Sequence, residues 1–207
     1  MSGFADFPLA RGLSAVVDPL IPGIFDGTGS KMLDQVTPVT AELLRFWFQQ
    51  DYCELRELNF HAGQRAAILH IIYVHEVLGT TRLRDLYEAV APEAMLEGGV
   101  LGEVTRDRHD HPKYAAKMAT GTGKTWVLNA LLVWQYLNKL ANPQDPRFSS
   151  NFLLVAPGLI VYDRLLDSFQ GKEQNGERDF SSCDIYRQQD LFIPDTYRTQ
   201  VFTFLQS

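Results

Sequence analysis

Residues 118–125 are Met-Ala-Thr-Gly-Thr-Gly-Lys-Thr, and this stretch decides how the rest of the chain is interpreted. A short apolar segment at 113–118 precedes it, and a long apolar run at 125–140 follows. The order of strand, glycine loop and helix is typical of loops that hold phosphates at a helix N-terminus. The full signature is G-x-x-x-x-G-K-[ST], and Met118 stands in place of its first glycine. We therefore predict a phosphate-binding loop at Met118–Thr125.

The residue types in this loop suit a nucleoside triphosphate, which we expect to be ATP with Mg²⁺. The glycines let the backbone turn sharply around the phosphates. The Lys124 ammonium supplies charge to the β- and γ-phosphates, and the Thr125 hydroxyl is a ligand for Mg²⁺. The alternative is a glycine-rich turn in which Lys124 is merely solvated. The predicted nucleotide-binding residues of the loop are Thr120, Gly121, Thr122, Gly123, Lys124 and Thr125, the last two also being the catalytic pair.

The pattern of residue types after Pro112 predicts an α/β fold. Lys113–Met118 and Phe152–Ala156 have the composition of buried strands, and Leu159–Phe169 has that of a helix. A last strand is expected at Gln200–Leu205. Alternating strands and helices predict a parallel sheet with flanking helices.

The chain before Pro112 is expected to be partly irregular and partly helical. Residues 1–39 are rich in Gly and Pro and predict an irregular lead-in, with a short strand at Leu13–Val17. Thr40 can cap a helix that begins at Ala41. A buried helix is predicted at Gly63–Leu78 and a short one near Leu83–Val90. The predicted division is 1–39, 40–112 and 113–207.

Together with these patterns, the phosphate loop resembles the first motif of superfamily 2 helicases of the DEAD/DEAH type. The chain looks most like the ATPase (Res) subunit of type III restriction enzymes. The resemblance implies a RecA-like P-loop domain, present here as an incomplete first motor domain behind a helical N-terminal segment. It also implies a cytoplasmic, ATP-dependent helicase or translocase that acts on double-stranded DNA with a modification or specificity subunit.

Two further stretches carry the resemblance. Asn59–Ile68, N-F-H-A-G-Q-R-A-A-I, looks like the glutamine motif, in which Gln64 would contact the adenine edge. An ordinary helix start with an exposed Gln64 is the alternative. Phe152–Leu166 is similar to a motif that contacts the DNA backbone, so Pro157, Gly158 and Arg164 are candidate DNA-binding residues. Arg164 as a merely solvated helix residue is an equal alternative.

The chain also departs from that family. It has no D-E-x-[HD] acidic motif, no second RecA-like domain and no arginine finger motif. Residues 79–112 suggest an insertion between Gln64 and Lys124. We therefore expect this chain by itself to bind ATP weakly and to hydrolyse almost none. Polarity, the choice between DNA and RNA, and a fused nuclease are not decided by the sequence.

Composition excludes several other classes of protein. No apolar run approaches the roughly 20 residues of a membrane span, and only Cys53 and Cys183 are present, so a disulfide framework is not expected. The net charge of −6 gives no general basic surface for nucleic acid. His109 and His111 are interpreted as loop residues rather than metal ligands, and His70 and His75 as packing residues.

Two other function classes remain open from the sequence. One is a P-loop phosphotransferase or signalling ATPase that does not act on nucleic acid. The other is a nucleotide-binding module that does not hydrolyse its ligand. Asp184, Asp190 and Asp195 are not expected to bind Mg²⁺, because none of them follows an apolar strand.

Overall fold

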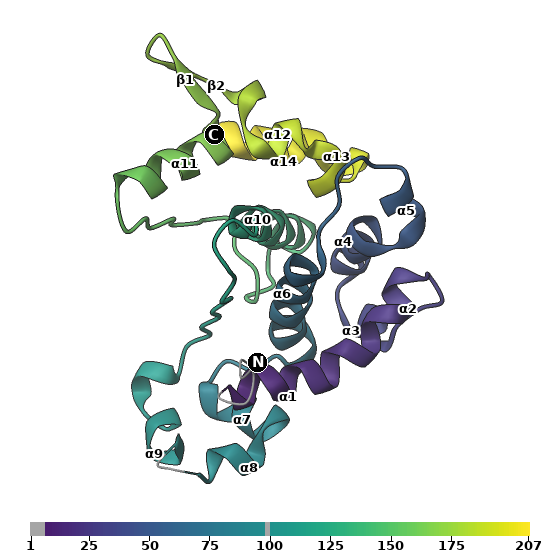
Figure 1. The fold of residues 1–207 in the computed structure, drawn as a ribbon, viewed down its shortest axis with the longest axis vertical. Coiled ribbons are helices and arrows are strands. Elements are labelled where there is room, and N and C mark those ends of the chain that lie inside the picture. Colours follow the sequence, from purple (N-terminus) through teal and green to yellow (C-terminus); the bar gives the residue numbers. More distant parts are fainter. Residues whose placement is uncertain (1–6, 98–99) are drawn as a thin grey trace.

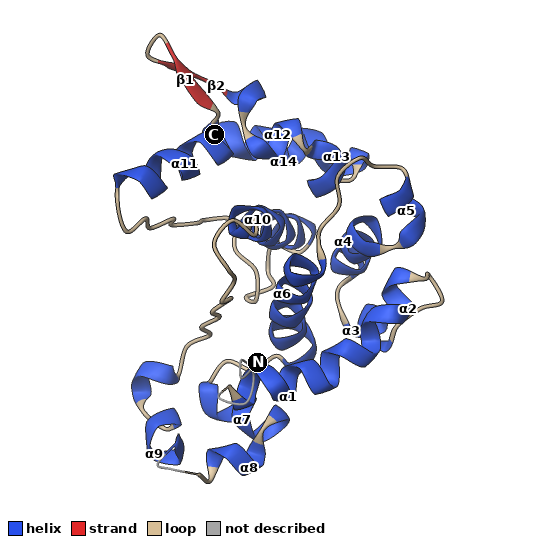
Figure 2. Ribbon diagram, in the orientation of Figure 1, coloured by secondary structure: helices blue, strands red, loops and turns tan. Residues whose placement is uncertain are grey.

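The computed structural model describes residues 7–97 and 100–207, most of which are helical (Figure 2). Before the phosphate loop the helical elements are α1 (Pro8–Val17), η1 (Asp18–Leu20), α2 (Ile21–Phe25), α3 (Lys31–Gln35), α4 (Pro38–Phe48), α5 (Gln50–Glu54), α6 (Ala62–Ile72), η2 (Tyr73–Leu78), α7 (Leu83–Val90), α8 (Pro92–Met95), α9 (Val100–Val104) and η3 (Asp107–His109). After it come α10 (Lys124–Ala141), α11 (Leu159–Gln170), β1 (Lys172–Gln174), β2 (Glu177–Asp179), η4 (Phe180–Ser182), α12 (Asp184–Arg187), α13 (Gln189–Phe192), η5 (Asp195–Tyr197) and α14 (Arg198–Gln206). Element η2 is a π-helix, and the other η elements are 3₁₀ helices.

Helices α4, α6 and α10 form the centre of the molecule (Figure 1). Helices α11 to α14 lie along one side of α10, and α7 to α9 lie at the opposite end. Trp47 of α4 and Trp134 of α10 are both almost completely buried. The indole N–H of Trp47 donates to the carbonyl of Phe192 over 3.0 Å, which joins α4 to α13. Burial of such large side chains is the main stabilising contribution to this core.

A buried carboxylate connects the central helices. Glu76, in the π-helix η2, is only 6% exposed. It accepts hydrogen bonds from the backbone N–H of Thr37 (2.8 Å), the hydroxyl of Thr40 and the indole N–H of Trp134 (2.7 Å). These donors compensate the cost of burying a polar group. Thr40 is therefore an interior residue, and the expectation that it caps a helix is wrong: Thr37 is the N-cap of α4 and Pro38 its first residue.

The expected irregular lead-in at 1–39 is wrong for the part that the structure describes. Pro8, Pro19, Pro22 and Pro38 each lie in the first turn of a helix, where a missing N–H costs nothing and the fixed φ favours helical geometry. The strand expected at Leu13–Val17 is instead the second half of α1. Residues 1–6 lie outside the described residues.

The parallel sheet expected after Pro112 is not present among residues 7–97 and 100–207. The segments 113–118 and 152–156 are extended but pair with no strand there, and Gln200–Leu205 lies within α14. Val201 is buried, and Phe204 stacks on Tyr136 of α10 with ring centroids 4.1 Å apart. Residues three apart share a helix face, so this packing favours the helix over the strand.

The sheet that the structure does contain is a small antiparallel hairpin of β1 and β2, with Lys172 opposite Asp179. Its turn is Asn175-Gly176, and both residues have positive φ, 55° and 85°. Asn-Gly is the preferred pair for such a tight hairpin turn. The hairpin, which the sequence analysis did not predict, thus follows from a local signal at Asn175-Gly176.

Four predicted helices are confirmed. The buried helix predicted at Gly63–Leu78 is α6 followed directly by η2, and the short helix at Leu83–Val90 is α7. The long helix after the glycine loop is α10, and the helix at Leu159–Phe169 is α11. Within the described ranges, no helix is both long enough and apolar enough to cross a lipid bilayer.

Candidate functional site

The glycine loop turns directly into α10. Gly121 and Gly123 both have positive φ, 80° and 67°, a region that residues with a Cβ rarely adopt. Gly123 is the N-cap of α10, and as a glycine it offers no side-chain cap to the first N–H groups of this long helix. Uncapped N–H groups and the positive end of a helix dipole are the features that bind anions. The predicted loop is thus built at a helix N-terminus, as its sequence requires.

Inside the loop, two side chains converge on one carbonyl. The Lys124 ammonium donates to the carbonyl of Ala119 over 2.7 Å, and the Thr122 hydroxyl donates to the same oxygen, also over 2.7 Å. Lys124 is exposed, and its partner here is a neutral group. Its positive charge is therefore not cancelled by a carboxylate in this contact. A phosphate oxygen is a stronger acceptor for an ammonium than a peptide carbonyl.

Two residues at the start of α6 contact backbone carbonyls of the glycine loop. The ring nitrogen Nε2 of His61 lies 2.9 Å from the carbonyl oxygen of Thr122, and Gln64 Nε2 donates to the carbonyl of Gly123 over 3.2 Å. Gln64 is only 3% exposed. Gln64 is therefore not exposed, although it does lie at a helix start, where its side chain completes the capping box of α6. His61 was not singled out from the sequence, although its position three residues before Gln64 is that of a capping box.

The other predicted residues of the nucleotide site lie on the same turn. Thr120 and Gly121 are exposed in the loop, and Thr125 is half-buried in the first turn of α10. A groove of about 340 Å³ runs from Lys124 along α10. Apolar side chains of α6, of α10 and of the segment before the loop form most of its lining: Ile71, Tyr114, Ala116, Met118, Val127, Leu128, Leu131 and Trp134.

The predicted DNA-contacting residues lie apart from the loop in sequence and are exposed. Pro157 and Gly158 precede α11, whose N-cap is Gly158, and Arg164 is on the exposed first half of that helix. The second half of α11 is attached to α10, since the amide of Asn129 donates to the buried hydroxyl of Ser168 over 3.3 Å. Leu153, Val155, Leu159 and Ile160 are each more than 70% exposed, which is unusual for large apolar side chains in one stretch.

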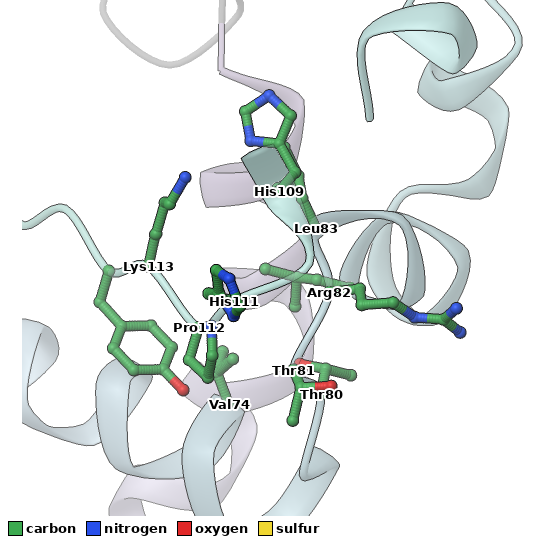
Figure 3. A pocket seen from close by; sticks show the side chains of 11 residues that line it. Val74, Thr80, Thr81, Arg82, Leu83, His109, His111, Pro112 and Lys113 are labelled. Atoms are coloured by element: carbon green, nitrogen blue, oxygen red, sulfur yellow. The ribbon is translucent and has the colours of Figure 1, made fainter. Parts of the chain in front are cut away.

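A smaller cavity of about 50 Å³ lies at the end of η2 (Figure 3), and Tyr114 lines both this cavity and the groove beside α10. Val74, Thr80 and Pro112 are among its lining residues, and Figure 3 shows the Arg82 side chain pointing away from the centre of the group. Arg82 forms an ion pair with Asp85 at 2.7 Å. The charge of Arg82 is therefore compensated outside the cavity.

The acidic and histidine residues weighed in the sequence have other partners. Asp190 and Asp195 both pair with Arg198 at 2.6 Å. His109 lies 3.0 Å from Glu103, and its hydrogen bond, with that of Arg108, lowers the pKa of Glu103 to about 2. In the described ranges there is no group of three or more His, Cys, Asp or Glu side chains that could hold a metal ion.

A packing role for His75 agrees with the structure. His75 contacts the Tyr114 hydroxyl (3.0 Å) and the carbonyl of Arg147 (2.6 Å), and its ring packs against Trp134 and Phe148. Burial lowers its pKa from the ordinary value of 6.5. His75 thus links the segment before the phosphate loop to the segment after α10.

Comparison with known proteins gives one match. The family model described as "Type III restriction enzyme, res subunit" matches residues 57–207, well over half of the chain. The match begins just before His61 and includes the loop, α10 and α11. No curated protein and no solved structure matches the chain.

Proposed function

The chain belongs to the family of type III restriction enzyme res subunits, and we propose that it is the ATP-binding part of an ATP-dependent DNA translocase of the helicase type. The observation that carries this proposal is the glycine loop at the uncapped N-terminus of α10, with Lys124 and Thr125 in its first turn. The predicted resemblance to the res subunit is confirmed by the family match.

The residues of the loop fit a magnesium-bound triphosphate. Gly121 and Gly123 both adopt a positive φ that residues with a Cβ rarely adopt, and this lets the loop turn sharply into α10. We propose that Lys124 gives up its contact with the Ala119 carbonyl and donates to the β- and γ-phosphates. The Thr125 hydroxyl would hold the magnesium ion, which, when bound, neutralises charge on the phosphate oxygens.

We further propose that Gln64 contacts the adenine edge after releasing one of its two internal hydrogen bonds. A carboxamide can both donate to and accept from adenine. The buried position of Gln64 next to Gly123 supports this, because the amide is already at the phosphate loop.

Double-stranded DNA is the proposed polymer substrate, with a modification or specificity subunit as partner. The proposed contacts are the backbone N–H groups of Gly158 and of the first turn of α11, which follow Pro157, and the guanidinium of Arg164. Their exposure at the start of α11 supports this assignment. As the resemblance implies, we assign the activity to the cytoplasm.

A RecA-like sheet in the functional protein is also a proposal. The segments 113–118 and 152–156 have no regular secondary structure, and Leu153 and Val155 of the apolar second segment are largely exposed. The groove beside α10 has the apolar lining that a sheet would cover. We propose that these two segments become strands of that sheet, and we retain 1–39, 40–112 and 113–207 as the proposed division of the chain.

The competing functions are a P-loop phosphotransferase or signalling ATPase, and a nucleotide-binding module without hydrolysis. Affinity for DNA that falls steeply with salt would favour the translocase, because phosphate contacts release counterions. A phosphotransferase would show no such dependence.

The test of nucleotide binding is titration of the chain with a fluorescent ATP analogue and Mg²⁺. Lys124→Ala should weaken binding at least tenfold while circular dichroism shows an unchanged fold. The matched control is Lys139→Ala. Lys139 lies at the other end of α10 and donates to the Asp145 carbonyl over 3.0 Å, so it reports the loss of a lysine–carbonyl contact outside the loop. Equal affinities of the wild type and Lys124→Ala would contradict the phosphate-loop assignment.

A further inference from the structure

The imidazole of His61 uses both of its nitrogens at once. Nδ1 accepts from the backbone N–H groups of Gly63 (3.0 Å) and Gln64 (3.3 Å), which caps α6. Nε2 lies 2.9 Å from the carbonyl oxygen of Thr122. A carbonyl can only accept, so Nε2 carries the proton, and Nδ1, which accepts, carries none. The contacts thus define His61 as a neutral imidazole with a fixed tautomer.

Gln64 uses its amide in the same way. Its oxygen accepts from the backbone N–H of His61 (3.0 Å), and its nitrogen donates to the carbonyl of Gly123. Two residues of one capping box therefore hold two consecutive carbonyls of the phosphate loop, those of Thr122 and Gly123.

Holding these carbonyls also orients N–H groups. In a trans peptide the C=O and the following N–H lie in one plane and point in opposite directions. Fixing the carbonyl of Thr122 therefore directs the N–H of Gly123 away from α6, and fixing the carbonyl of Gly123 does the same for the N–H of Lys124. These are N–H groups at the start of α10, which a bound phosphate would use.

We propose that His61 is a positioning residue for the phosphate loop: through Thr122 it orients the N–H groups that receive the triphosphate. This inference rests on the proposed nucleotide-binding function. His61 does not contact the ligand in this role. It acts through the backbone, and it couples the N-terminus of α6 to the loop.

Two substitutions separate the cap from the loop contact. In His61→Asn the side chain remains a good N-cap, because asparagine ranks among the best, but it is too short to reach the Thr122 carbonyl. In His61→Ala both functions are lost. We expect His61→Asn to keep a melting temperature close to the wild type, and His61→Ala to lower it by several degrees, as loss of an N-cap does.

Affinity for a fluorescent ATP analogue with Mg²⁺ is then measured at a temperature where circular dichroism shows all variants folded. We expect His61→Asn to bind about 3- to 10-fold more weakly, the range expected for loss of one hydrogen bond. GTP and inorganic triphosphate should weaken by the same factor, since the effect acts on phosphates rather than on the base. A purely structural cap would leave His61→Asn unchanged.

Lys124→Ala is measured in parallel, and it distinguishes failure of the His61 positioning role from failure of the proposed nucleotide-binding function. If Lys124→Ala loses binding and His61→Asn binds like the wild type, the positioning role of His61 is wrong and the proposed function stands. If the wild type binds no nucleotide, or Lys124→Ala binds as well as the wild type, the proposed function itself is wrong. Weakening of ATP alone in His61→Asn would also overturn the inference.

Discussion

Gln64 lies so close to Gly123 that a Cβ on residue 123 would stand only 2.4 Å from Gln64 Nε2. Such a separation is much shorter than any ordinary contact, so one of the two groups would have to move. The amide nitrogen of Gln64 also donates to the Gly123 carbonyl. Glycine is favoured here by its left-handed φ of 67°, and a Cβ would in addition displace the Gln64 amide from the carbonyl that it binds.

Gly123→Ala should accordingly destabilise the protein more than Gly121→Ala. Both positions have positive φ, which costs a residue with a Cβ about 1–2 kcal/mol. Only residue 123 adds a steric conflict, since a Cβ at residue 121 meets nothing within 4 Å. Thermal unfolding of the two single variants measures the difference.

Thermal unfolding of Gly123→Ala and Gly121→Ala in a Gln64→Ala background identifies the cause of the difference in stability. The conflict disappears when the amide is removed, so the extra cost of Gly123→Ala should shrink to that of Gly121→Ala. An extra cost that is unchanged in the double variant would show that Gln64 does not approach Gly123 in this way.

Gln64→Ala by itself should weaken ATP more than GTP. Loss of the contact with the loop carbonyl affects both nucleotides, whereas loss of a contact with the adenine edge affects ATP alone. Competition titrations with the two nucleotides against a fluorescent analogue measure both losses. Equal weakening of ATP and GTP would leave Gln64 with the loop-holding role and remove its role in base recognition.

The glycine loop and α10 were predicted from the sequence, whereas the start of α4 and the strands were not, and the physical reasons differ. The loop and α10 were predictable because Gly121, Gly123 and Lys124 impose local backbone and charge requirements. The helix predicted to begin at Ala41 begins instead at Pro38, because proline in the first turn favours a helix.

Strand predictions failed because strands depend on partners. Residues 152–156 have strand composition, yet nothing described in the chain pairs with them, so they remain extended and exposed. Residues Gln200–Leu205 form part of α14 instead, because Phe204 stacks on Tyr136 and this tertiary packing outweighs the β-propensity of the segment. The tether from His61 was missed because a contact across 61 positions of sequence leaves no local pattern.

The stability of the protein should fall in mild acid partly through His75. Burial lowers the pKa of His75 from 6.5, so near that pH the unfolded chain binds a proton that the folded chain does not. The contribution of His75 is complete above about pH 6.5 and is lost as the pH falls toward its lower folded pKa. Protonation would also make Nδ1 a donor, so the Tyr114 hydroxyl, 3.0 Å away, would have to accept from it instead of donating.

His75→Gln is the variant that tests this. Its melting temperature should fall less steeply than that of the wild type between about pH 6.5 and 5, since the side chain no longer titrates. His111→Gln, at an exposed loop position, serves as the control for loss of a histidine. A wild-type pH profile retained in His75→Gln would assign the acid sensitivity to other groups.

This 207-residue chain should bind ATP but hydrolyse almost none of it. Phosphoryl transfer needs a carboxylate that holds the metal, a group that orients water and, in most such enzymes, an arginine finger worth roughly 10³–10⁵ in rate. In the proposed site Lys124 and Thr125 would supply only the phosphate and metal contacts. Asp190 and Asp195 are bound to Arg198 on the surface, and the part of the chain that the structure describes has no cluster of carboxylate and histidine side chains beside the loop. Phosphate release should therefore stay far below the roughly 1 s⁻¹ of a working enzyme, with or without DNA.

Turnover near that rate that disappears in Lys124→Ala would reveal a catalytic carboxylate within this chain. Asp184→Asn, Asp190→Asn and Asp195→Asn would then identify it by the loss of turnover with nucleotide affinity retained.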